Sequence, residues 1–140
     1  MPPMESELRN VVVEWIAFAD DDLKAAELLG RGGHARQAAY HAQQAAEKFI
    51  KAALIRHQVK FEARSHEIYD LRHSLSQAAP DLASTLEVAD FLSRFATARR
   101  YPGGGRPVNS KQAEEAVRAA QTIAERVRVA LASFLEPPAP

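Results

Sequence analysis

The positions of glycine and proline constrain the fold of this chain more than any other feature. All six glycines fall in two short clusters, one at 30–33 and one at 103–105. The eight prolines lie near the two ends of the chain, at Pro80, and on either side of the second glycine cluster. Because Gly and Pro destabilise helix interiors, these positions mark the connections between helices. The intervening segments are rich in strong helix formers and predict five helices, near 8–29, 35–58, 66–79, 81–99 and 110–135.

Apolar residues recur within these segments at the spacing of an α-helix. The second segment carries a face of alanines that allows close helix packing. Asn109 and Gln112 have the spacing of a capping box, and Pro80 suits a first helical turn. The sequence therefore predicts an all-α fold, an antiparallel bundle of about five helices with two long N-terminal helices. The stripe of the last segment consists of Ala113, Ala116, Val117, Ala120, Ala124, Val127, Leu131 and Phe134.

Length and composition limit the class of protein. With 140 residues, 46% of them apolar, we expect a single domain over residues 1–140 with its core at about 8–135. The absence of Cys excludes disulfides, thiolate metal sites and cysteine nucleophiles. A formal net charge of zero argues against nonspecific nucleic-acid binding through a broad basic surface, but it leaves a local basic cluster open. The short polar N-terminus does not fit a signal peptide, and no apolar run approaches the roughly 20 residues of a membrane span, so we expect a cytoplasmic protein.

Asp22 breaks the apolar pattern of the first predicted helix. By helical angle it lies inside the apolar stripe, where a carboxylate needs a cation or several hydrogen-bond donors. Two interpretations remain open at this point. Asp22 is either a structural residue, in an ion pair or at a helix edge reaching water, or one wall of a polar site. The stripe consists of Trp15, Phe18, Ala19, Ala26 and Leu29.

The end of the fourth predicted helix offers cations for such a site. It reads Arg99-Arg100-Tyr101 and is followed by Pro102, three glycines and Arg106. Backbone N–H groups of consecutive glycines can form an anion-binding concavity, and three nearby arginines add positive charge. A phosphate of a nucleotide or of RNA would suit this place. The alternative is a flexible loop next to ordinary cations at a helix C-terminus.

Two other polar faces are candidates of second rank. On the second helix, Glu47 and Lys51 form a favourable i,i+4 pair, so we expect a solvated face, with an interface as the alternative. On the third helix, His66, Tyr69, Asp70 and His73 point away from the apolar residues. Two histidines and one aspartate are few ligands for a metal, so we expect an exposed or dimer-facing surface, no metal and no other cofactor. The second-helix face consists of Tyr40, Gln43, Gln44, Glu47, Lys48 and Lys51.

Four segments resemble, in the right order, the motifs of one known family. The run from Trp15 to Leu29, with its Asp22-Leu23 pair, resembles the first-helix pattern of HEPN domains. The run from Ala39 to Leu54 is very similar to the second-helix signature of that family. The run from Ser65 to Leu71 resembles its short His-containing segment, and Arg100-Tyr101-Pro102 resembles its arginine–tyrosine–proline motif. The resemblance covers nearly the whole chain.

This resemblance implies a fold, partners and two kinds of activity. It implies a bundle of about five helices that dimerises. Members are commonly encoded beside a minimal nucleotidyltransferase and form toxin–antitoxin pairs with it. In many of them the HEPN protein is an RNA endonuclease, whereas others lack the nuclease motif and are thought to bind nucleotides or to assist the transferase.

The sequence departs from the pattern of the nuclease members. Their motif is an arginine, four to six residues, and then a histidine, but no histidine follows Arg99 or Arg100 anywhere in the chain. Arg36 and His41 match formally, yet five residues on a helix correspond to about 140° of rotation, which points the two side chains to different faces. Short motifs also match by chance. The catalytic residues are therefore left unassigned, and His66 or His73 would serve only if the fold or a dimer brings one of them to the arginines.

The function predicted from the sequence is binding rather than catalysis. We expect a homodimer that binds the phosphate of a nucleotide or RNA through Arg99, Arg100 and the following loop. Asp22 would hold one of these arginines, and Tyr101 would stack on a base. The expected partner is a nucleotidyltransferase in a toxin–antitoxin-type module. The alternatives are a metal-independent RNA endonuclease and a purely structural dimerisation module.

Overall fold

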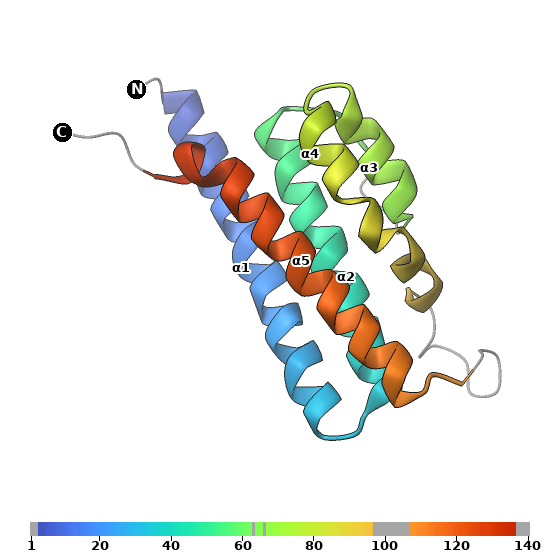
Figure 1. Cartoon of the computed structure of the whole chain (residues 1–140). Helices are drawn as coiled ribbons and strands as arrows, with labels where there is room; N and C mark the ends of the chain where they lie inside the picture. The colour runs from blue at the N-terminus through green and yellow to red at the C-terminus, as the bar shows by residue number, and fades with distance from the viewer. Residues whose placement is uncertain (1–2, 63, 66, 97–106, 137–140) are drawn as a thin grey trace.

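The computed structural model describes residues 3–62, 64–65, 67–96 and 107–136. Over these ranges the fold is helical and contains no strand, which confirms the predicted all-α class. Three long helices, α1, α2 and α5, lie side by side, and the shorter elements pack together along one flank (Figure 1). The elements are α1 (Pro3–Arg31), α2 (Ala35–Arg56), α3 (Ile68–Ser76), α4 (Pro80–Thr85), the 3₁₀ helix η1 (Glu87–Phe95) and α5 (Ser110–Leu135).

The helix ends follow the breakers in the sequence. Gly33 adopts a φ of 83° in the turn between α1 and α2, a left-handed conformation that favours glycine. Helix α4 begins at Pro80, where the missing N–H costs no helical bond. Asn109 and Gln112 form the predicted capping box, with each side chain bonded to the backbone N–H of the other residue at 2.8 and 2.9 Å.

The prediction of a single α-helix over 81–99 is wrong. Helix α4 ends at Thr85, and a nine-residue 3₁₀ helix follows over the described part of that segment. The hydroxyls of Ser84 and Thr85 bond to the carbonyl oxygens three residues earlier and compete with α-helical bonding. The buried residues also recur at a spacing of three. A 3₁₀ helix has three residues per turn and keeps such residues in one row, whereas in an α-helix, with 3.6 residues per turn, each would lie further round the helix than the one before. This row consists of Ala83, Leu86, Ala89, Leu92 and Phe95.

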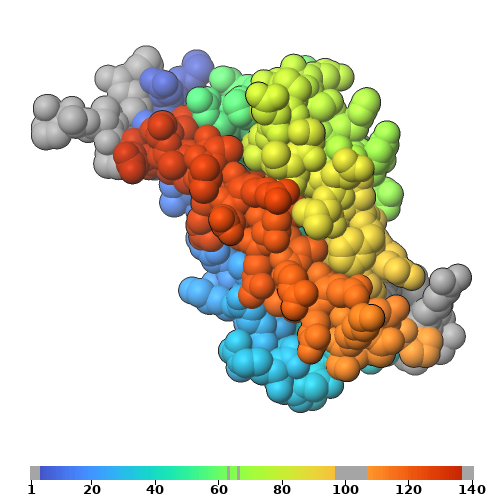
Figure 2. Space-filling model, viewed as in Figure 1, coloured from blue at the N-terminus to red at the C-terminus, as the bar shows by residue number. Residues whose placement is uncertain are grey.

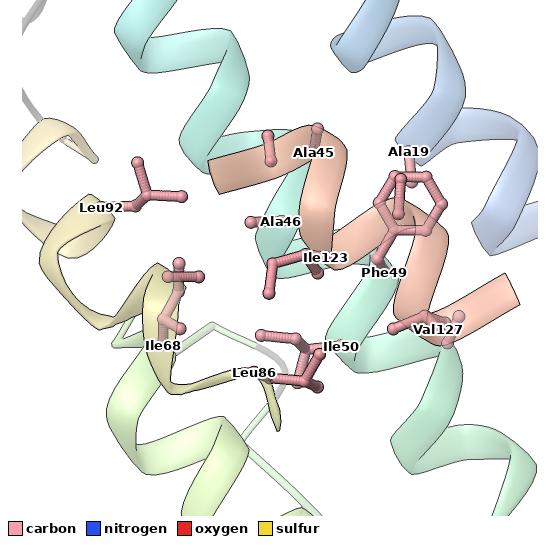
Figure 3. Close-up of a cluster of buried hydrophobic side chains, with 14 of the residues drawn as sticks. Ala19, Ala45, Ala46, Phe49, Ile50, Ile68, Leu86, Leu92, Ile123 and Val127 are labelled. Atoms are coloured by element: carbon pink, nitrogen blue, oxygen red, sulfur yellow. The ribbon is translucent and has the colours of Figure 1, made fainter. Parts of the chain in front are cut away.

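The core forms around α2, which packs against α1, α5, α3 and η1. The alanine face of α2 is fully buried, as the sequence predicts, and it lets α1 and α5 approach closely. Figure 3 shows Phe49 beside Ala19 and Val127, and Ile50 beside Leu86. In Figure 2, α5 crosses the front of the molecule and hides most of α2 behind it. The stripe predicted on α5 is also confirmed, because its members are buried or packed against the core.

The predicted stripe on α1 is correct only in part. Ala19 and Ala26 are buried, but Phe18 has 53% of its surface exposed. The face of α1 that contacts the core instead includes Val12 and Ile16, both buried. Helix α1 also begins at Pro3 rather than near residue 8. Met4, Val11 and Phe18 are therefore exposed on the outward-facing side of this helix.

Two polar contacts hold the short elements in place. The guanidinium of Arg72 on α3 donates to both oxygens of Asp90 on η1, at 2.9 and 2.7 Å. The Ser93 hydroxyl on η1 accepts a bond of 2.8 Å from the backbone N–H of Ile68, the first residue of α3. These contacts fix η1 against α3 just before the segment that carries Arg99 and Arg100. Within the described ranges, no helix is long and apolar enough to cross a membrane.

Candidate functional site

Asp22 lies at the centre of a polar cluster between α1 and α2. Its side chain is 14% exposed, which agrees with its predicted place inside the apolar stripe. Oδ1 lies 2.9 Å from Nδ1 of His41, and Oδ2 accepts a hydrogen bond from Nζ of Lys48. Both partners come from α2, about two turns apart along that helix. The carboxylate therefore has the cation and donors that its partial burial requires.

The carboxylate fixes the proton of the imidazole. An ionised carboxylate can only accept hydrogen bonds, so the nitrogen facing it, Nδ1 of His41, must carry a proton. The other ring nitrogen, Nε2, then has a free lone pair in the neutral ring or an N–H in the imidazolium. The side chains of His41 and Lys48 are 27% and 28% exposed, so both can be reached from solvent. The cluster thus offers a hydroxyl-binding nitrogen beside an ammonium group that suits a phosphate.

A second polar cluster on α2 lies next to the first and is buried. Glu47 accepts from Lys51 at 2.8 Å and from the amide of Gln43 at 3.0 Å. The expectation of a solvated Glu47–Lys51 face is wrong, because both side chains are almost fully covered. Trp15 from α1 and Phe61 from the segment after α2 lie over Lys51, each with its ring centre 6.0 Å from Nζ. This cover comes from distant parts of the chain.

Gln44 lies beside the buried cluster at the half-exposed surface of α2. Its amide donates to the side-chain oxygen of Gln43 at 2.7 Å. The ring of Tyr40 packs edge-on against that of His41, with the ring centres 5.3 Å apart. One side of α2 is therefore a continuous row of polar side chains, half-buried or buried, facing away from the alanine core.

The loop residues predicted for the site fall outside the described residues. These are Arg99, Arg100, Tyr101 and Arg106, and His66 of the second-rank face also falls there. Contact between Asp22 and one of the arginines therefore stays a prediction. The described residues that flank the loop lie toward the end of the bundle where α2 begins (Figure 1). This is the end of α2 that carries Tyr40 and His41.

Tyr69 and His73 occupy a different surface from Asp22. Both are exposed on α3, as predicted, and their rings stack with centres 6.1 Å apart. The guanidinium of Arg72 lies 5.3 Å from the centre of the Tyr69 ring. Of the second-rank residues that the structure describes, Lys48 is thus the one that joins the Asp22 cluster.

His41 is the site residue that sequence reasoning misses. The formal Arg36–His41 match points to it, but the rotation between the two residues argues against a shared site, and no hydrogen bond or ion pair joins them among the described residues. The signal that could find it is its position in the hairpin. Counting back and forward from the Gly33 turn places Asp22 level with the stretch of α2 between His41 and Lys48.

A separate pocket of about 360 Å³ lies where α1, α2 and the start of α5 meet. It is lined by residues of both charges, including Glu27, Arg31, Glu114 and Arg118, but not by Asp22, His41 or Lys48. Because its charges balance, it has no net attraction for an anion. In the described part of the chain, no group of three His, Asp or Glu side chains is placed to hold a metal ion.

Comparison with known proteins gives a consistent result. A family model for the HEPN domain matches residues 12–130. The solved structure of TT1696 from Thermus thermophilus is 29% identical, with a TM-score of 0.67 over 84% of this chain and 96% of that chain. ST0689, described as an archaeal HEPN homologue, is 27% identical, with a TM-score of 0.61 over 86% and 97% of the two chains. Among curated proteins, no match to this chain was found.

Proposed function

The chain belongs to the HEPN domain family, and we propose that it binds the phosphate of a nucleotide or of RNA. The binding site would combine the Asp22–His41–Lys48 cluster with Arg99, Arg100 and Arg106. In this proposal the protein is a cytoplasmic homodimer that works with a nucleotidyltransferase in a toxin–antitoxin-type module. No catalytic step is assigned to it.

The observation that carries the proposal is that His41 and Lys48 both contact the carboxylate of Asp22. Asp22 holds both side chains in place, and each side chain stays partly exposed to solvent. Lys48 keeps two N–H donors for a phosphate, and Nε2 of His41 can accept from a ribose hydroxyl. A nucleotide presents these two groups next to each other. Because Asp22 cancels one positive charge, tight binding needs the arginines of the loop as well.

HEPN domains are commonly associated with nucleotidyltransferases, and this association supports the proposed partner. Tyr101 is the proposed stacking platform for a base, since an aromatic ring stacks on any base. The proposal predicts a nucleotidyltransferase reading frame beside this gene, and a pull-down of that protein would test the partnership. Recovery of a stable complex supports the module, and failure to co-purify after co-expression would count against it.

Binding is tested by fluorescence anisotropy with a 5′-labelled single-stranded RNA and with ATP as competitor. We expect Lys48→Gln to weaken binding at least tenfold, about 1.4 kcal/mol, and Arg100→Ala to do the same. Lys24→Gln is the matched control, because it removes the same charge from an exposed position on the other helix, α1. Absence of binding by the unmodified protein, or equal effects of Lys48→Gln and Lys24→Gln, would contradict the proposed site.

One observation favours the alternative of a metal-independent RNA endonuclease. His41 has the Nδ1–carboxylate contact of a general base, and its Nε2 could accept the proton of a 2′-hydroxyl. The histidine that the loop lacks would then come from α2. RNA cleavage in the presence of chelator, lost in both His41→Gln and Arg100→Ala, would establish this alternative. Binding without cleavage would leave the binding function standing.

A further inference from the structure

A hydrogen-bond relay of three side chains on α2 connects the buried carboxylate of Glu47 to the surface at Gln44. Glu47 accepts from the amide nitrogen of Gln43 at 3.0 Å, and the amide oxygen of Gln43 accepts from the amide nitrogen of Gln44 at 2.7 Å. Gln43 is fully buried, whereas Gln44 is partly exposed. The relay therefore joins an ion pair in the interior to a side chain that solvent can reach.

The charge of Glu47 sets the direction of every bond in this relay. A glutamine amide has an acceptor oxygen and a donor nitrogen of nearly the same shape, so an isolated glutamine can flip between two orientations. A carboxylate paired with a lysine, as Glu47 is with Lys51 at 2.8 Å, can only accept hydrogen bonds. Gln43 must then turn its nitrogen toward Glu47 and its oxygen toward Gln44. Gln44 in turn must donate from its nitrogen.

Gln44 is consequently held with its carbonyl oxygen, Oε1, turned away from Gln43. Among the residues that the structure describes, no donor contacts this oxygen, and no buried side-chain oxygen lacks a hydrogen-bond partner. Oε1 therefore reaches the surface as an acceptor. A flip of Gln44 would leave the buried oxygen of Gln43 without its donor, which costs more than a surface hydrogen bond returns. The surface of α2 thus presents an acceptor of fixed orientation at this position.

Gln44 lies between His41 and Lys48 along α2, about one helical turn from each. Around the helix axis it is turned by about 60° from His41 and about 40° from Lys48, in the same sense. The three side chains therefore form a triangle, with two corners on the carboxylate of Asp22 and the third to one side. The ribose hydroxyl, the phosphate and the base of a nucleotide are also arranged as a triangle.

We propose that Gln44 makes the site selective for bases with an exocyclic amine, adenine and cytosine, over bases with a carbonyl at the same position. The amine is the donor that projects furthest from the ring, and it matches an acceptor that is held at the helix surface. A carbonyl in its place would turn a second acceptor toward Oε1. Gln43 is the positioning residue, because it prevents the flip that would let Gln44 donate to that carbonyl. The inference rests on the proposed function for its phosphate-bearing ligand and adds the choice of base.

Competition against the labelled RNA, followed by fluorescence anisotropy, tests this selectivity with ATP and ITP. The two nucleotides have the same ribose and phosphates, but the base carries an amine at C6 in ATP and a carbonyl in ITP. We expect ATP to compete about fivefold more strongly than ITP, which is the effect of one net hydrogen bond at a partly exposed position. CTP and UTP differ in the same way at C4 and should show the same preference.

Two variants separate the contact from the relay that orients it. Gln44→Met keeps the length of the side chain and removes its amide, so we expect the preference to disappear because ATP competes less strongly. Gln43→Met leaves Gln44 free to flip, so we expect the preference to shrink because ITP competes more strongly, a gain that a loss of folding would not produce. Gln121→Met is the matched control, since Gln121 is an exposed glutamine on α5 outside the relay. Circular dichroism would check that each variant folds.

Equal competition by ATP and ITP, or a preference for ATP that persists in Gln44→Met, would overturn the proposed selectivity. So would loss of the preference in Gln121→Met. If ATP and ITP compete equally and both weaken in Lys48→Gln, the choice of base is refuted and the proposed function stands. If neither RNA nor any of the four nucleotides binds, the proposed function is refuted, and the selectivity is refuted with it.

Discussion

Replacing Glu47 with glutamine should destabilise the bundle by about 3 kcal/mol. The side chains of Lys51 and Glu47 are only 3% and 5% exposed, so the ammonium group cannot recover water when the carboxylate is lost. Breaking a buried ion pair by removing one charge typically costs about 3–5 kcal/mol. We place the cost at the lower end because the amide oxygen of glutamine can still accept from Lys51. For a chain of this size, the loss corresponds to a fall in Tm of about 10 °C.

The free energy of unfolding would be measured by urea denaturation followed by circular dichroism. Glu114→Gln is the matched control, because Glu114 is an exposed glutamate four residues before a cation, Arg118, and its replacement should change stability by less than about 0.5 kcal/mol. The double variant Glu47→Gln/Lys51→Met should be more stable than Glu47→Gln alone, since it removes both charges of the buried pair and keeps an apolar stem against Trp15. A Glu47→Gln variant as stable as wild type would refute this reasoning.

Three further predictions concern contacts elsewhere in the fold. Asp90→Asn should lower the free energy of unfolding by about 1–3 kcal/mol, because it removes the negative charge that accepts two hydrogen bonds from Arg72. The same contact raises the pKa of Arg72. Thermal unfolding would show the change, and an unaltered Tm would contradict it. Burial and the neighbouring Arg56 lower the pKa of His57, so the unfolded chain takes up this proton more readily. The stability contributed by neutral His57 is therefore present above the ordinary histidine pKa and is lost as pH falls below it, and urea midpoints at pH 7.5 and 5.5 should differ less in His57→Gln than in wild type. Equal pH dependence in the two proteins would refute this. Asn109→Ala should cost about 1 kcal/mol through loss of the capping box, and urea titration showing no loss would mean that the box does not stabilise α5.

Local signals in the sequence predict much of the fold. The capping residue Asn109, Pro80 in a first helical turn and the glycines between α1 and α2 act on their own segments, so the sequence specifies them directly. The alanine face of α2 is equally readable from its period. The 3₁₀ helix escapes prediction, although buried residues from Ala83 to Phe95 recur at a spacing of three, because the composition of the segment also suits an α-helix.

The site is harder to predict because it depends on contacts between helices. The burial of Lys51 comes from Trp15 and Phe61, which no local pattern connects to it. Asp22 stands out because it interrupts an apolar stripe, but its described partners are His41 and Lys48 rather than a residue near it in the sequence. Helical angle alone gives the direction in which a side chain points. The register of the hairpin decides which side chain it meets.

Binding of a phosphate-bearing ligand at the α1–α2 face can be observed residue by residue in two-dimensional ¹H–¹⁵N NMR spectra during titration with AMP. We expect the largest shifts around Asp22, His41 and Lys48, saturating together, with weaker saturation in Lys48→Gln. Binding at this face would be contradicted by shifts confined to the separate pocket around Gly30, Arg31 and Arg118. It would also be contradicted if neither millimolar AMP nor RNA, titrated in a second experiment, shifted any signal.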